Sequence, residues 1–242
     1  MTSPDLAGAA PLSRIARIAA GVSLVLAGLT NGLSQYLSVV FSGARGDETY
    51  SEYIRWGAQH GSIFQSEQAA LVVSMLFLPI GLLGLAQVSR WRTPKLTAVA
   101  IVLALVGMWG FHNVITLGYT AGAIAPEVIG VDQAVALNDG LSEHAGSVIM
   151  ALVPHLLLTF VGMILLCIAC WRSRSFPRIP LALLLAFLVW DYLLPAFGPL
   201  ESHLLLFIAL AWLGVHVIRM SDAAWRGAEG LRATRSESIL SR

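Results

Sequence analysis

Long apolar stretches are the feature of this sequence that most restricts its fold. A helix needs about 20 largely apolar residues to cross the hydrocarbon core of a bilayer, and a chain inside a bilayer must satisfy its own backbone hydrogen bonds. The 242 residues are 57% hydrophobic and only 12% charged, whereas an ordinary soluble domain carries roughly 25% charged residues. The sequence therefore predicts an all-α fold, a polytopic membrane bundle of six transmembrane helices. The expected spans are residues 17–40, 69–88, 96–118, 145–170, 179–199 and 203–219.

The basic residues lie almost entirely on one side of this predicted bundle. Short cytoplasmic loops of membrane proteins are enriched in Lys and Arg. Of the 15 Lys and Arg residues, only Arg45 and Arg55 fall in connections assigned to the outer side. Both termini are therefore predicted to lie in the cytoplasm (N-in/C-in). All of these basic residues except Lys95 are arginine, which is a hint of a GC-rich genome, so we expect a multi-pass protein of a bacterial cytoplasmic membrane.

The sequence leaves no room for a separate soluble domain. Residues 1–220 are expected to form a single transmembrane helical domain, in which the two long outer loops have helical rather than strand character. Residues 221–242 are expected to form a cytoplasmic tail, partly disordered, with Trp225 at the inner membrane surface. The formal net charge is only +1 and no basic face carries interleaved aromatics, which argues against nucleic acid as a partner. Cys167 and Cys170 lie in an apolar run and are interpreted as packing residues.

Polar side chains inside the predicted spans identify a candidate site. Ionisable groups are costly in the hydrocarbon core unless they pair or meet water, so they are candidates for function by default. At about 1.5 Å per residue along each helix, Asn31, His112 and Asp191 lie at about the same depth. Other polar residues lie near this level or at the outer helix ends. The sequence therefore predicts a polar cavity in the outer half of the bundle.

The last two spans are expected to form a tight antiparallel hairpin. They are joined only by residues 195–202, and connections of this length join antiparallel neighbours. This hairpin would hold Asp191 close to Glu201 and His203.

The chemistry favoured by these residues is acid–base catalysis without a cofactor. Asp191 lies in a run of apolar and aromatic residues, so its carboxyl must be protonated or paired. A protonated carboxyl is the group that donates a proton to an alkene or an epoxide. We therefore expect an isomerase or cyclase that takes a lipophilic small molecule from the bilayer. The expected catalytic residues are Asp191 as acid, His112 or Glu143 as base, and His144; the expected substrate-binding residues are Asn31, Gln35, Glu67, Trp109, Asn113, His155, Tyr192, Glu201 and His203.

Several short segments resemble styrene oxide isomerases, which are small four-helix membrane enzymes that hold haem b through one histidine and convert epoxides to aldehydes. The resemblance covers roughly residues 20–171 and implies haem b with His60 as its axial ligand. The chain departs from the family pattern by two additional helices and by Gln65, Ser66 or Glu67 where a neighbouring asparagine is expected. The segments that carry the resemblance are Trp56-Gly-Ala-Gln-His60-Gly-Ser62, Gly28 to Asn31, Leu78-Pro79 and Val153-Pro154.

Two functions without catalysis stay open. Broken helices and inverted repeats, which mark many carriers, are not visible, but a small bundle can conduct as a homo-oligomer. In an accessory membrane subunit, the same polar residues would serve packing, because Asn, Gln and His often form hydrogen bonds between helices. Replacing Asp191 with Asn separates these classes, since only an enzyme would lose activity while it keeps its fold.

Overall fold

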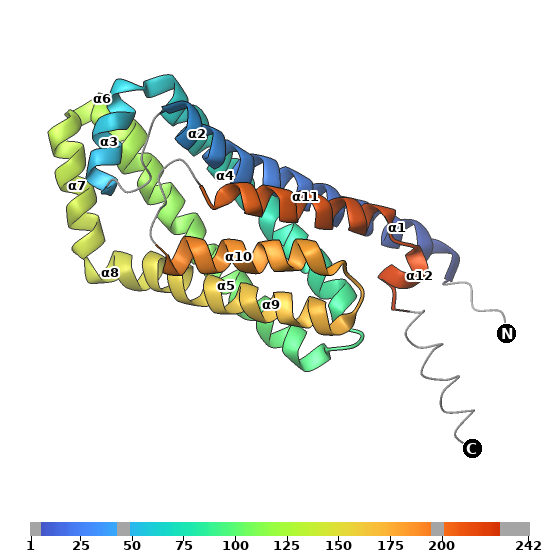
Figure 1. Ribbon diagram of the computed structural model, residues 1–242. Helices are drawn as coiled ribbons and strands as arrows, with labels where there is room; N and C mark the ends of the chain where they lie inside the picture. Colours follow the sequence, from blue (N-terminus) through green and yellow to red (C-terminus); the bar gives the residue numbers. More distant parts are fainter. Residues whose placement is uncertain (1–5, 43–48, 195–200, 228–242) are drawn as a thin grey trace, which may run out of the picture.

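The structure is a computed structural model, and it describes residues 6–42, 49–194 and 201–227 (Figure 1). Within these ranges the chain is helical and contains no strand, so the predicted all-α fold is confirmed for this part of the chain. In chain order the elements are α1 (Leu6–Ala27), η1 (Gly28–Leu33), α2 (Ser34–Ser42), α3 (Tyr50–Gln59), α4 (Gly61–Ser89), α5 (Pro94–Tyr119), η2 (Thr120–Ile124), α6 (Ala125–Ile129), α7 (Val131–Glu143), α8 (Ala145–Ser147), η3 (Val148–Leu152), η4 (Pro154–Thr159), α9 (Phe160–Ser173), α10 (Arg178–Leu193), α11 (His203–Arg219) and α12 (Asp222–Trp225).

Four helical segments are long and apolar enough to cross a membrane. Some of them join α-helical and π-helical turns without a break: Ala27 and Ser34, at the two joints of η1, keep right-handed helical backbone angles, so α1, η1 and α2 form one rod. This result fits the predicted multi-pass membrane protein. The four segments are Ser13–Val40, Gly61–Ser89, Pro94–Ile129 and Ala145–Ser173.

Helix α11 has the predicted bounds 203–219, whereas α10 ends at Leu193, before the end of the predicted span 179–199; residues 195–199 lie outside the described residues. Helices α10 and α11 have 16 and 17 residues, which at 1.5 Å per residue corresponds to about 24–26 Å. A hydrocarbon core is about 30 Å thick. The two helices therefore fall short of a full crossing by about one helical turn.

The long helices pack as a closed ring. Each of α1, α4, α5, α9, α10 and α11 contacts the next in this order, α11 returns to α1, and α4 also contacts α9. As a result α1 and α11, which are far apart in the sequence, lie side by side along the bundle (Figure 1). Fully buried leucines from different helices fill the interior, among them Leu24, Leu82, Leu166, Leu184 and Leu213.

Glycines permit the closest approaches between these helices. A Cβ atom added to Gly214 of α11 would lie 2.5 Å from the carbonyl oxygen of Gly21 on α1. A Cβ atom added to Gly162 of α9 would lie 2.3 Å from the backbone nitrogen of Ala104 on α5. Small residues at helix interfaces are typical of membrane bundles, where close backbone packing replaces the hydrophobic effect between helices.

One end of the bundle carries the short helices α3, α6 and α7, which we call the cap (Figure 1). Ile54 of α3 packs in a small buried cluster with Ala125, Ala134 and Val135. The predicted helical character of these two outer loops is therefore confirmed for their described residues. Helix α3 begins with a capping box, in which the backbone N–H and the hydroxyl of Thr49 donate to Glu52 and lower the pKa of its carboxyl.

The opposite end carries α12, which packs on the bundle through an ion pair with Arg17 and through the ring of Trp225. Arg17 of α1 donates to the carboxylate of Asp222 at 3.1 Å and to the carbonyl oxygens of Val217 and Ile218. Trp225 is only 5% exposed. The prediction for Trp225 is thus wrong, because the ring is buried within the fold. Residues 228–242, for which partial disorder was predicted, lie outside the described residues.

Candidate ligand pocket

A cavity of about 570 Å³ lies at the cap end of the bundle. Its walls come from α2, α4, α5, α8 and η3, and the cap helices α3 and α7 contribute Tyr53 and Asn138. Ligand pockets for small molecules have volumes of about 300–1,000 Å³ and mostly apolar walls with a few polar groups. The size of this cavity is therefore suitable for one small organic molecule.

Glu67 is the buried ionisable group in the wall of this pocket. Its side chain is on α4, and the residue is 6% exposed. The hydroxyl groups of Ser38 and Tyr53 donate hydrogen bonds to its two carboxylate oxygens, and Gln35 is a further hydrogen-bond partner. Within the described ranges no Lys or Arg forms an ion pair with Glu67. Hydroxyl and amide groups therefore hold a carboxyl at the pocket surface without an ion pair to Lys or Arg in the described part of the chain.

The remaining walls combine apolar and small polar groups. Leu71, Val114, Ala151 and Leu152 supply apolar surface, while Ser147 supplies a hydroxyl group. Ala151 and Leu152 belong to the π-helix η3. π-helical turns occur frequently at functional sites. Here η3 and the helix that carries Glu67 line the same pocket.

Only part of the predicted site lines the pocket. Gln35 and Glu67 do. Asn31 is buried in η1, one turn from Gln35, and does not belong to the lining. Asn113 donates its side-chain N–H to the carbonyl oxygen of Met150 at 3.0 Å, so it joins α5 to η3 as an interhelical hydrogen bond.

The structure does not place His112 and Trp109 at the site. Both are exposed, and they share a face of α5 with the exposed Val102 and Val106. This face points away from the bundle interior. The predicted convergence of His112 with Asp191 is therefore wrong, because equal depth along two helices does not fix the rotation of either helix about its axis.

Glu143 and His144 lie at the junction of α7 and α8, outside the pocket lining. Both are exposed. The Nδ1 atom of His144 accepts a hydrogen bond from the backbone N–H of Gly146 at 3.2 Å, which makes it the N-cap of α8. The predicted catalytic role of these two residues therefore has no support in the geometry.

His155 and Tyr192 form an aromatic group between α5, η4 and α10. The His155 ring stacks on Phe111 at a centroid distance of 4.6 Å, and the Tyr192 ring lies 5.9 Å from His155 and 5.2 Å from Phe160. In the described part of the chain the Nδ1 atom of His155 is buried without a hydrogen-bond partner. This group is separate from the lining of the large pocket.

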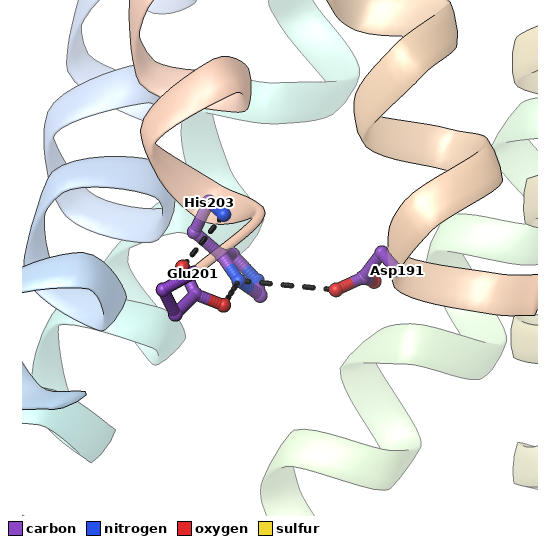
Figure 2. Close-up of side chains that lie close together, drawn as sticks. All are labelled: Asp191, Glu201 and His203. Carbon is purple, nitrogen blue, oxygen red and sulfur yellow. Dashed lines mark hydrogen bonds and ion pairs between the residues drawn. The ribbon is translucent and has the colours of Figure 1, made fainter. Parts of the chain in front are cut away.

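Asp191, Glu201 and His203 lie together, as the hairpin prediction required (Figure 2). The Nδ1 atom of His203 is 2.6 Å from Oε1 of Glu201 and 3.8 Å from Oδ1 of Asp191. Asp191 also accepts a hydrogen bond from the hydroxyl of Ser202 at 3.0 Å. Asp191 is therefore paired, and it lies in the last turn of α10 rather than among apolar neighbours at mid-helix.

His60 lies at the junction of α3 and α4. Its Nδ1 atom is 3.0 Å from the carbonyl oxygen of Trp56, and its ring stacks on the Trp56 ring at 4.6 Å. The cavity beside this junction, lined by Gly57 and Gly61 among others, measures only about 180 Å³, below the usual size of a ligand pocket. The residues around His60 therefore do not fit a haem, and we derive no chemical step from one; haem b stays a prediction of the resemblance alone.

Sequence reasoning missed three residues that complete the pocket around Glu67. The sequence pattern could have identified Ser38, which shares a helix face with Asn31 and Gln35, and Gln68, which adjoins Glu67. It could not have identified Tyr53, because the position of Tyr53 depends on the fold of the cap.

No protein-family model, curated protein or solved structure matches this chain. The class that the fold and the pocket define is an all-helical protein with several helices suited to a membrane and a ligand-sized pocket at one end. Its function must be inferred from the geometry of the site.

Proposed function

We propose that this chain is a six-helix integral membrane enzyme of the isomerase or cyclase type, in which Glu67 performs acid–base chemistry on a lipophilic small molecule. The observation that carries this proposal is the buried carboxyl of Glu67 in the wall of a pocket of about 570 Å³. The sequence favoured Asp191 for this role. The paired, partly exposed position of Asp191 now favours Glu67 instead.

The proposed topology has six spans with both termini in the cytoplasm of a bacterial cell. The start of the described chain and α12 lie at the same end of the bundle (Figure 1), where Arg17 contacts Asp222. An even number of spans returns a chain to the side of the membrane on which it began, as these two ends require. The turns that carry Arg90, Arg92 and Lys95 and that carry Arg172 and Arg174 belong to this same end, which supports its assignment to the cytoplasmic side. The short helices α10 and α11 would cross where the bilayer is locally thinner.

The proposed reaction moves a proton within an alkene. The protonated Glu67 carboxyl gives its proton to one alkene carbon, which leaves a carbocation on the adjacent carbon. The resulting carboxylate removes a proton from a neighbouring carbon, so the double bond shifts and Glu67 is protonated again. No electron is gained or lost overall, and no co-reactant is consumed. Tyr53 and Ser38 hold the carboxyl in place during both transfers.

The lining of the pocket narrows the class of substrate. Its apolar walls favour a hydrocarbon body, while Asn138, Ser142 and Ser147 supply polar groups on the other walls. An isoprenoid alcohol fits this pattern, because it combines carbon–carbon double bonds with one hydroxyl. The apolar body would reach the pocket from the lipid phase.

The test is hydrogen exchange into a named probe. Purified protein in detergent is incubated with farnesol in D₂O, and mass spectrometry measures deuterium bound to carbon. We expect exchange with the natural protein and a fall of at least about a hundredfold in Glu67→Gln, because a positioned acid–base group typically contributes 10²–10⁴-fold. Glu127→Gln is the matched control, since Glu127 is an acceptor for Gln65 on the exposed surface.

Two outcomes would contradict the proposal. Equal exchange in the natural protein and in Glu67→Gln would remove Glu67 from the chemistry. Saturable binding of farnesol without any exchange in the natural protein would assign the pocket to a carrier or an accessory subunit.

A further inference from the structure

The ends of α10 and α11 bring three metal-ligating side chains together outside the pocket. Asp191 comes from the last turn of α10, His203 is the first residue of α11, and Glu201 lies two residues before it. One ligand atom from each residue lies within 4.8 Å of the other two. Figure 2 shows the two carboxylates on either side of the His203 ring, all three side chains pointing toward one another.

The imidazole of His203 can form a hydrogen bond through Nδ1 to only one of the two carboxylates. His203 contacts Glu201 at 2.6 Å through Nδ1. Asp191 is 3.8 Å from the same nitrogen, which is too far for a hydrogen bond. A single Nδ1–H group cannot serve both oxygens, so Asp191 faces the imidazole without a hydrogen bond to it, and its hydrogen bond comes from the hydroxyl of Ser202.

The charge of the cluster also points to a cation. Two carboxylates carry a charge of −2, and a protonated imidazole would leave −1. The side chains of Asp191, Glu201 and His203 are only 30%, 15% and 20% exposed, and an uncompensated charge in such a setting is costly. In the described ranges no Lys or Arg pairs with any of the three. A divalent ion with a neutral imidazole makes the cluster neutral.

The donor atoms select a class of ion. One imidazole nitrogen and two carboxylate oxygens suit Zn²⁺ and related transition-metal ions better than Mg²⁺ or Ca²⁺. Bonds of about 2.0–2.2 Å to zinc place tetrahedral ligand atoms about 3.3–3.6 Å apart. The distances from Nδ1 of His203 to Glu201 and to Asp191, 2.6 and 3.8 Å, lie on either side of this range. Rotation of the Glu201 side chain removes most of the difference. Phe187 packs edge-on against the His203 ring at 5.3 Å and fixes its orientation.

We propose that Asp191, Glu201 and His203 form a binding site for a divalent transition-metal ion, with Zn²⁺ as the reference case. The ion joins the end of α10 to the start of α11 across the hairpin and keeps a further coordination position for water. The site is distinct from the pocket around Glu67, and it does not depend on the function proposed for that pocket.

The experiment uses the full chain, purified in detergent and freed of metal with a chelator. Calorimetric titration with ZnCl₂ is expected to show one ion bound per chain. Titration with CoCl₂ is expected to give visible d–d absorption bands, which report coordination by the protein directly. In His203→Ala and in Asp191→Asn we expect these bands to disappear and the Zn²⁺ affinity to fall at least about tenfold, the lower end of the range for lost support of a metal site.

Matched controls separate this site from other histidines and carboxyls. His144→Ala removes an exposed histidine, and Glu127→Gln removes an exposed carboxyl; both are expected to bind Zn²⁺ as the natural protein does. Absence of Co²⁺ bands in the natural protein, or Zn²⁺ binding that persists in Asp191→Asn and His203→Ala, would overturn the proposal. Should His203→Ala fail to fold, the isosteric Asp191→Asn decides the question.

Discussion

Glu67 illustrates how a carboxyl can be retained inside an apolar bundle. Removing a charged group from water costs several kcal/mol unless other groups replace the lost solvation. Ser38 and Tyr53 each donate a hydrogen bond to one carboxylate oxygen, and His203 is near enough to act on Glu67 electrostatically. These groups come from three different elements, so the environment of Glu67 exists only when the bundle and the cap are assembled.

The contribution of Tyr53 can be measured by Tyr53→Phe. The substitution removes the hydroxyl but keeps the ring, which stacks on Trp56 at 5.7 Å and contacts Phe64 at 5.1 Å. We expect exchange of deuterium into farnesol to fall about tenfold, which corresponds to about 1.4 kcal/mol of transition-state stabilisation. Tyr119→Phe, which changes a tyrosine outside the pocket lining, should leave the rate unchanged. An unaltered rate in Tyr53→Phe would show that Ser38 and Gln35 position Glu67 without it.

Residue identity predicted which groups are costly in the bundle but not where they point. Asn31, Gln35 and Ser38 share a helix face, and two of them reach the pocket as that face predicts. His112 and Asn113 are adjacent in sequence, so their side chains diverge by about 100° around α5; only Asn113 meets a neighbouring helix. The choice between such residues requires the order and rotation of the helices, which one sequence does not provide.

At the scale of elements, the interface between α1 and α11 joins helices that lie near the two ends of the sequence. Gly21 and Gly214 allow the two backbones to meet. The neighbouring α1–α4 contact uses Gly81 and Gly84 against Leu24 and Ala20. Helix α1 is thus held on two sides by glycine contacts, which explains why it closes the ring.

Gly214→Ala tests this interface. The new Cβ would lie 2.5 Å from a backbone oxygen and 3.0 Å from the backbone nitrogen of Val25, neither of which can turn aside. The helices must separate, and overpacking of this kind typically costs about 1–3 kcal/mol. We expect the midpoint of thermal unfolding in detergent to fall by several degrees.

The control for this substitution is Gly140→Ala on α7. A Cβ atom there meets nothing within 4 Å, and alanine favours the helix by up to about 1 kcal/mol. Its unfolding midpoint should stay the same or rise. A similar fall in both variants would indicate that the effect of Gly214→Ala does not come from the α1–α11 contact.

The helices themselves were largely predictable from the sequence, and their boundaries less so. Apolar length predicted the helical regions, and helical character in the outer loops anticipated α3 and α7. The sequence placed residues 179–199 in one span, whereas α10 ends at Leu193 and Leu194 has extended backbone angles. Residues 195–199, which the predicted span also included, lie outside the described residues, so the difference is established at Leu194.

At the scale of the whole molecule, the two ends of the bundle differ in composition. The end with α12 carries basic turns, such as Arg90 beside Trp91 and Arg178 beside Trp171. The cap end carries acidic groups, such as Asp132 and Asp139, which pair with Arg55 and Ser51. A bilayer between these ends would leave the basic turns on its cytoplasmic side and the pocket close to the opposite surface.

The short hairpin of α10 and α11 offers the sharpest test of this topology, because it either crosses the bilayer or enters and returns without reaching the far surface. Leu194 is described, 48% exposed, and lies just beyond the end of α10. In Leu194→Cys, a membrane-impermeant maleimide should label intact cells if all six helices cross, and should label neither intact nor opened cells if the hairpin ends within the lipid.

Two control variants define the two sides of the membrane. Gln133→Cys in the cap should be labelled in intact cells, and Arg92→Cys only after the cells are opened. The native Cys167 and Cys170 are buried and should not react. Labelling of Leu194→Cys with the same pattern as Gln133→Cys therefore requires six spans, because a chain with only the four long ones would leave this residue without contact with either aqueous phase.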